Sequence, residues 1–197
     1  MDNPTRLLLE RAVFKLECAN LLSNDNIIEA DNNATTTCFA FSSGMQAVTS
    51  ILLAHSSPKT TVLIPTDVYH GVRSLLSDVL SRHGVKVREL NMTTSNGDGG
   101  GEKAIGDAIS EIATAMDISK KDNNNDDNNN DDLHNIIVWM ETPSNPKCEV
   151  VDIKAVCDTV RDIAGRWKHV VDVTTVVDGT MASPVLTRPL EVCCVII

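Results

Sequence analysis

The sequence predicts an α/β domain, built as a mostly parallel sheet with helices on both faces. Short apolar segments alternate along the chain with segments whose apolar residues recur at helical spacing, the pattern of strands joined by crossover helices. The strands read as nearly continuous apolar runs, which is typical of a sheet covered on both faces. With 197 residues and a hydrophobic content of 42%, the chain favours one domain with a sizeable core.

The first helix is expected to begin at Asn3 and Pro4, because asparagine is a good N-cap and proline suits the first helical position. Its apolar residues then recur three or four positions apart. The stretch 67–84 is expected to be a loop followed by a helix that a glycine stops. Further helices are expected at residues 44–55, around 102–116 and at 151–165.

Strands are expected where β-branched and other apolar residues cluster. These segments are residues 35–42, 61–65, 85–90, 135–141 and 168–178, and the final "VCCVII" is expected to start a central strand. Residues 122–132 contain only Asn and Asp, so they cannot be buried and are expected to form a disordered surface insertion. These patterns therefore predict a single domain over residues 1–197, interrupted by that insertion.

The charge pattern argues against two classes of partner. The net charge is −10, and residues 117–132 account for −4 of it with six Asp and two Lys, leaving −6 for the rest. No cluster of Lys and Arg with interleaved aromatics occurs, so we expect no nucleic-acid partner. The apolar runs are far too short to span a bilayer, so we expect no membrane partner.

The cysteines and histidines show no metal-binding pattern. The six cysteines contain no C-x-x-C pair and follow no secretory signal, so reduced core thiols in an intracellular compartment are expected, with a metal site as the alternative. The five histidines lack ligand spacing and are expected at the surface or at helix ends. No metal is predicted.

Open α/β sheets bind ligands beyond the carboxyl ends of their strands, and four stretches fall there. In "SSGMQAV", Gly44 lets backbone amides approach a ligand, and the helix N-terminus that follows favours an anion such as phosphate. A plain strand-to-helix turn is the alternative. In "PTDVYHG", Tyr69 is the only tyrosine and suits stacking on a planar ring, whereas a half-buried loop tyrosine is the alternative.

In each of the other two stretches, an apolar strand ends in an acidic residue. In "METPSNP", Glu141 ends a strand, and two prolines stiffen the loop that aims the Asn145 amide, unless the loop is only a connector. In "VVDGT", Asp178 ends an apolar strand, where a buried carboxylate needs a cation or hydrogen bonds. Its partner is either a group of the protein or a protonated ring nitrogen. A phosphate cradle, an aromatic stacker, an amide and this carboxylate together indicate pyridoxal phosphate.

Five stretches, in order, resemble the Cys/Met-metabolism family of pyridoxal-phosphate enzymes, the group of cystathionine γ-synthase and the cystathionine β- and γ-lyases. They are "NPTRLLLERAVFKLE", "FAFSSGMQAV", "DVYHGVRSLL", "VWMETPSNPKCEVVDIKAVCD" and "VVDGTMASPVLTRPLE". The resemblance implies part of the large domain of a fold-type I enzyme. It also implies pyridoxal 5'-phosphate as cofactor, and carbon–sulfur bond chemistry on cystathionine or related sulfur amino acids by a lyase or a γ-synthase.

The resemblance assigns a role to each matching residue. Gly44 and Met45 would give backbone amides to the cofactor phosphate. Tyr69 would stack on the pyridine ring and, as the catalytic residue, help with proton transfer. Asn145 would lie near the ring hydroxyl and the substrate carboxylate. Asp178 would pair with the pyridinium.

Thr180 would line the same pocket as these residues. A homo-oligomer, either a dimer or a tetramer, is expected for a full-length member. A cytoplasmic location is expected, with a plastid also open.

The sequence also departs from the family pattern. The family continues past the "RPLE" stretch into a Ser-x-Thr-Lys motif, whose lysine forms the Schiff base with the cofactor, and none of the nine lysines lies in such a motif. A Tyr-x-Arg pair expected before "NPTR" is also missing. The chain is therefore expected to be truncated at both ends, to lack the C-terminal domain and to be inactive as given. A non-catalytic dimerisation or regulatory fragment and an unrelated nucleotide-binding domain are the alternatives.

The Asn/Asp segment yields a first prediction. Its composition cannot offset the entropy lost on ordering, so deleting residues 122–132 is expected to leave the melting temperature almost unchanged. A replacement of equal length in Gly and Ser controls for loop length. A loss of several degrees in a thermal melt of the deletion variant would show that the segment packs against the domain.

Overall fold

The computed structural model describes residues 3–18, 38–93, 100–122, 133–192 and 195–197, and its centre is a five-stranded sheet. Every pair of neighbouring strands is parallel, in the order β2-β1-β3-β4-β5. This confirms the predicted parallel α/β architecture. The strands are β1 (Thr60–Pro65), β2 (Lys86–Leu90), β3 (His134–Glu141), β4 (Val171–Asp178) and β5 (Val195–Ile196).

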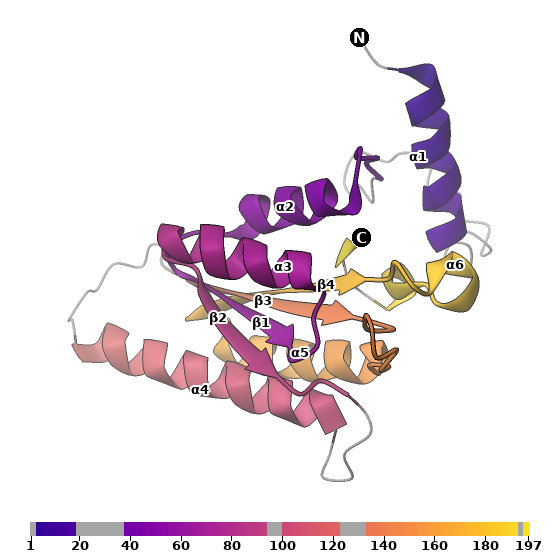
Figure 1. The fold of residues 1–197 in the computed structure, drawn as a ribbon. Helices are drawn as coiled ribbons and strands as arrows, with labels where there is room; N and C mark the ends of the chain where they lie inside the picture. The colour runs from indigo at the N-terminus through magenta and orange to yellow at the C-terminus, as the bar shows by residue number, and fades with distance from the viewer. Residues whose placement is uncertain (1–2, 19–37, 94–99, 123–132, 193–194) are drawn as a thin grey trace.

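Helices cover both faces of the sheet (Figure 1). Helices α2 and α3 lie over one face, and α4 and α5 lie over the other. The helices are α1 (Pro4–Glu17), α2 (Gly44–His55), α3 (His70–Ser74), α4 (Gly100–Asp122), α5 (Ile153–Trp167) and α6 (Ser183–Leu186). Helix α3 continues through a π-helical turn at Leu75–Val79 and a 3-10 turn at Leu80–His83, and another 3-10 turn spans Pro189–Glu191.

Strand β3 shows why the sheet is buried on both sides. Successive side chains of a strand point to opposite faces. Ile136 and Val138 therefore pack with α4 and α5, while Ile137 and Trp139 pack with α2 and α3. All four are at most 1% exposed, so the continuous apolar run in the sequence reflects two covered faces.

The structure confirms the predicted start of the first helix, the glycine that ends the helical stretch before residue 85, and the bounds of α2. The Asn3 side chain accepts from the amide of Thr5 at 3.0 Å, which makes it the N-cap of α1. Gly84 ends the helical stretch after β1 with φ +86°, a conformation that glycine adopts without steric cost. Helix α2 spans residues 44–55, as predicted.

Several expectations were wrong. Residues 38–42 form no strand, and the amide of Ala40 instead donates to Oε1 of Glu10 in α1 at 2.8 Å. His134 is buried at the start of β3, where its Nε2 lies 2.9 Å from Oγ1 of Thr61. Cys148 is exposed rather than in the core.

The end of α4 and the place of the last strand also differ from or refine the predictions. Helix α4 extends six residues beyond the expected 116. The predicted last strand is present as β5, at the edge of the described sheet. Residues 35–37 of the predicted first strand, 123–132 of the predicted insertion, and Cys193 and Cys194 lie outside the described residues. No helix in the described ranges is both long and apolar enough to cross a membrane.

Candidate active site

The strand order brings the predicted site residues to one edge of the sheet. The chain leaves β1 toward β2 on one side, while β3 and β4 follow on the other side of β1. Such a switch point opens a crevice beyond the carboxyl ends of the neighbouring strands. Tyr69 follows β1, Asn145 follows β3, and Asp178 ends β4. Helix α2 begins on the side to which the arrowheads of β3 and β4 point (Figure 1).

The first turn of α2 leaves two amides free for a ligand. Oγ of Ser43 caps the amide of Gln46 at 3.2 Å, and Oε1 of Gln46 accepts from the amide of Ser42 at 3.1 Å. No acceptor among the described residues receives the amides of Gly44 and Met45. A Cβ on Gly44 would meet no atom within 4 Å, so the space beside these amides is open. Free amides at a helix N-terminus suit a phosphate group.

Tyr69 lies beside this helix start. A Cβ on Gly71 would be 2.7 Å from Cε1 of Tyr69 and 2.8 Å from Sδ of Met45, so glycine allows both side chains to approach the backbone there. The Tyr69 side chain is 44% exposed, which leaves part of the ring accessible. Tyr69 and Asn145 line one cavity of about 430 Å³, together with Lys147. The lining of this cavity does not include the other predicted site residues, which are Gly44, Met45, Asp178 and Thr180.

Hydrogen bonds hold the loop that contains Asn145 at several positions. The amide of Thr142 donates to the backbone oxygen of Asp178 at 3.1 Å, and the amide of Ser144 donates to the oxygen of Glu149 at 2.9 Å. Oγ of Ser144 accepts from the amide of Glu149 in return at 3.1 Å. The Thr142–Pro143 and Asn145–Pro146 peptide bonds are both cis. The hydrogen bonds of Thr142, Ser144 and Glu149 support the prediction of a stiff loop.

Asp178 has a satisfied oxygen and a free one. The residue is only 9% exposed, and its Oδ1 accepts from the amide of Thr180 at 3.0 Å and from the hydroxyl of Thr180 at 2.6 Å. Within the described residues, no Lys, Arg or His pairs with Asp178, and Oδ2 accepts no hydrogen bond. The core arginine considered as a partner is therefore not found there. A carboxylate in this state fits a cationic nitrogen of a ligand.

Glu141 is the site residue that sequence reasoning noted but left without a role. It pairs in register with Asp178 and is 4% exposed. Its Oε2 accepts from the amide of Tyr69 at 2.7 Å, and its Oε1 accepts from the amide of Asn145 at 2.8 Å. The available signal was the same as for Asp178, an acid at the end of an apolar strand.

Burial raises the pKa of the Glu141 carboxyl above its usual range. The hydrogen bonds from Tyr69 and Asn145 oppose this shift, and the nearby carboxylates of Asp178 and Asp67 add to it. The carboxylates of Glu141, Asp178 and Asp67 thus lie near one another, and no cation of the described chain pairs with Glu141. The site is acidic at the strand ends and rich in amide donors at the start of α2.

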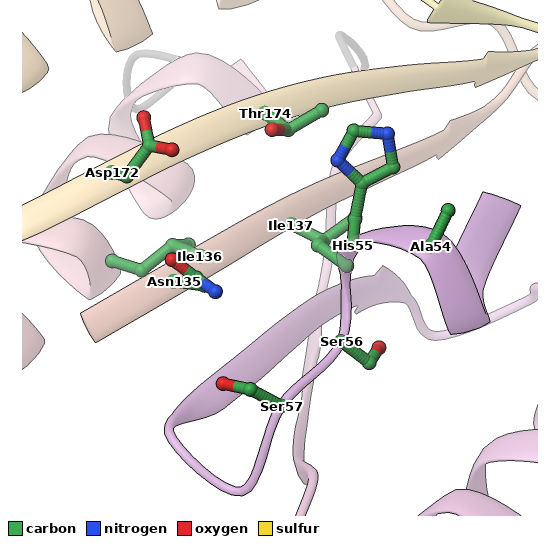
Figure 2. Close-up of a pocket in the computed structure, with 9 residues that line it drawn as sticks. All are labelled: Ala54, His55, Ser56, Ser57, Asn135, Ile136, Ile137, Asp172 and Thr174. Atoms are coloured by element: carbon green, nitrogen blue, oxygen red, sulfur yellow. The ribbon is translucent and has the colours of Figure 1, made fainter. Parts of the chain in front are cut away.

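A second cavity, of about 310 Å³, lies at the opposite, amino ends of the strands (Figure 2). It contains His55, Ser57 and Asp172, a set that resembles a nucleophile with its base. The three side chains point apart in Figure 2, and the Ser57 hydroxyl lies 3.3 Å from the hydroxyl of Thr60 instead. This cavity therefore lacks the contacts of a catalytic relay.

Comparisons with known proteins identify the family. The family model for Cys/Met metabolism PLP-dependent enzymes matches residues 1–107 and 99–197. Cystathionine γ-lyase of Saccharomyces cerevisiae is 30% identical over 96% of this chain and 35% of its own length. Cystathionine β-lyase of Bacillus subtilis is 29% identical over 95% of this chain and 34% of its own length. The chain thus spans about a third of the length of these relatives.

Solved structures show the same fold. A crystal structure of a cystathione γ-lyase from Micromonospora echinospora matches 98% of this chain and 37% of its own, with 28% identity and a TM-score of 0.64. A cystathionine γ-synthase structure from Xanthomonas oryzae matches 98% of this chain and 36% of its own, with 23% identity and a TM-score of 0.65. These matches confirm the predicted fold class.

The raised pKa of Glu141 predicts a particular pH dependence of stability. An acid whose pKa is higher in the folded state stabilises the fold fully below its unfolded pKa, and this contribution is lost as pH rises through the folded pKa. Glu141→Gln cannot ionise. The free energy of unfolding of the parent chain, relative to this variant, is therefore expected to fall as pH rises from the ordinary glutamate range upward.

Urea unfolding at constant ionic strength measures this difference. Glu149→Gln, in the loop after β3, controls for the removal of one negative charge. A relative stability that rises with pH would contradict the direction assigned to the Glu141 pKa.

Proposed function

The chain belongs to the Cys/Met-metabolism family of pyridoxal-phosphate-dependent enzymes, and on this premise we propose that the described edge of the sheet holds the cofactor for carbon–sulfur bond chemistry. The substrate class is cystathionine or a related sulfur amino acid, as the names of the relatives suggest. Asp178 is the observation on which the proposal rests. It is nearly buried, has one free oxygen, and forms no ion pair with the described residues.

The start of α2 would hold the cofactor phosphate. The free amides of Gly44 and Met45 are donors, and the positive end of the helix dipole adds to their attraction for an anion. The open space beside Gly44 leaves room for the phosphate oxygens. Because Met45 and Tyr69 both lie against Gly71, the phosphate site and the stacking ring are adjacent.

Asp178 would hold a proton on the ring nitrogen. Pyridoxal phosphate, when bound, supplies an electron sink for charge that develops at the substrate, and a protonated ring strengthens that sink. Thr180 donates twice to Oδ1, which fixes the carboxylate, and Oδ2 would remain available to the ring nitrogen. The low exposure of Asp178 strengthens its attraction for a cation, since few waters screen it.

Tyr69 and Asn145 would form the walls beside the ring. The accessible ring of Tyr69 provides a stacking surface, and its hydroxyl is the group proposed to move a proton between ligand and protein. The Asn145 amide would lie near the ring hydroxyl and the substrate carboxylate. The support for their shared place is that both residues follow strands that end at the same edge of the sheet as Asp178.

The relatives are named as lyases and synthases alike, so the choice between these two reactions stays open in the proposal. We retain the homo-oligomer of a full-length member and the cytoplasmic location, with a plastid also open, as predictions from the sequence. The alternative is a non-catalytic dimerisation or regulatory fragment, which detection of this chain in cells without a longer product would favour.

The test is the affinity for pyridoxal phosphate of the chain and of its Asp178→Asn variant. Removing one partner of a buried ion pair costs about 3–5 kcal/mol, so the variant is expected to lose most of its affinity. Asp172→Asn, at the exposed amino end of the same strand, is the matched control and should bind as the parent does. Titration followed by cofactor absorbance gives the values. Equal affinity of the Asp178→Asn variant and the parent chain would refute the assignment.

A further inference from the structure

The two oxygens of Glu141 serve two different loops. Oε2 accepts from the amide of Tyr69 in the loop after β1, and Oε1 accepts from the amide of Asn145 in the loop after β3. These loops belong to neighbouring strands, and each one holds a wall residue of the proposed cofactor site. One buried side chain therefore connects both walls.

These two amides depend on Glu141 alone. Their neighbours in the same loops have backbone acceptors: the amide of Val68 donates to Pro65 at 3.1 Å, and the amide of Ser144 donates to Glu149 at 2.9 Å. The amides of Tyr69 and Asn145 have no second acceptor among the described residues. Loss of the carboxylate would thus leave one unsatisfied amide in each loop.

Stability of the sheet does not explain an acid at this place. Glu141 is almost fully buried, forms no ion pair in the described chain, and has the carboxylates of Asp67 and Asp178 nearby. Burying a charge without a cation is unfavourable, and an apolar residue would pack there at lower cost. The favourable contribution of Glu141 lies in the two loops that it connects.

We propose that Glu141 is a positioning residue that fixes Tyr69 and Asn145 relative to each other, so that the two walls of the cofactor site keep one spacing. The inference rests on the proposed function for its purpose, because the walls matter only if a ring lies between them. Glu141 acts through backbone amides and is not proposed to touch the cofactor.

The chemistry of the side chain makes the proposal specific. A carboxylate offers an acceptor oxygen to each amide, whereas glutamine has one oxygen and places an NH₂ donor against the other amide. Glu141→Gln is therefore expected to release one loop and keep the other. Glu141→Ala is expected to release both.

Hydrogen exchange measured by mass spectrometry on the whole chain tests this, in peptides covering residues 66–71 and 142–148. A hydrogen bond to a charged group contributes enough for its loss to speed exchange roughly ten- to hundredfold. We expect this acceleration in both peptides for Glu141→Ala and in only one for Glu141→Gln. Asp172→Asn, which removes an exposed charge at the far end of β4 but neither hydrogen bond, should change neither.

Tyr69 provides a second readout, because it is the only tyrosine and a fluorotyrosine label gives one ¹⁹F resonance. That resonance should shift or broaden in Glu141→Ala and stay unchanged in Asp172→Asn. If Glu141→Ala does not fold, Glu141→Gln alone decides the matter by whether exchange rises in one loop only. Unchanged exchange in both peptides of a folded Glu141 variant would overturn the proposal, as would equal acceleration across the domain.

Cofactor affinity measured on the same samples separates this inference from the proposed function. Exchange that changes as expected, in a parent chain that does not bind pyridoxal phosphate, supports the role of Glu141 and refutes the proposed function. Tight binding by the parent chain with unchanged exchange in the variants refutes the role of Glu141 and leaves the proposed function standing.

Discussion

Parallel pairing of all the described strands is the constraint on which the rest of the structure depends. Parallel neighbours cannot be joined by a tight turn, so each connection crosses a face of the sheet, here mostly as a helix. The carboxyl ends of β1, β3 and β4 therefore meet at one edge. Tyr69, Asn145 and Asp178 come together there because each follows or ends one of these strands.

Two acidic residues lie side by side at that edge, and their hydrogen bonding differs. Glu141 and Asp178 are partners in the register of β3 and β4. Both oxygens of Glu141 accept backbone amides, whereas only one oxygen of Asp178 is bonded, to Thr180. Both acceptor oxygens of Glu141 are thus used within the protein, whereas Oδ2 of Asp178 remains an acceptor for a cation. Under the proposed function, the free amides at the start of α2 would hold the phosphate, and Asp178 would hold the protonated ring.

Much of the fold could be predicted from local signals. Helix α2 has its predicted bounds because Ser43 caps it at the start, and Gly84 ends the helical stretch after β1 because it adopts a positive φ. Residues 38–42 were misjudged because their composition favours a strand, while a distant carboxylate, that of Glu10, binds this segment. The role of Glu141 was missed for the same reason, since it depends on contacts between loops far apart in the chain. The identity of the cofactor came from motifs, and the separate tasks of the two acids came only from the structure.

The central claim is that Asp178 keeps the ring nitrogen of pyridoxal phosphate protonated. The most direct measurement is the ¹⁵N chemical shift of ring-labelled pyridoxal phosphate bound to the chain at neutral and mildly alkaline pH. The account predicts the shift of a protonated ring in the parent chain and that of a neutral ring in Asp178→Asn. A neutral ring nitrogen in the bound parent chain, or the same shift in both proteins, would contradict it.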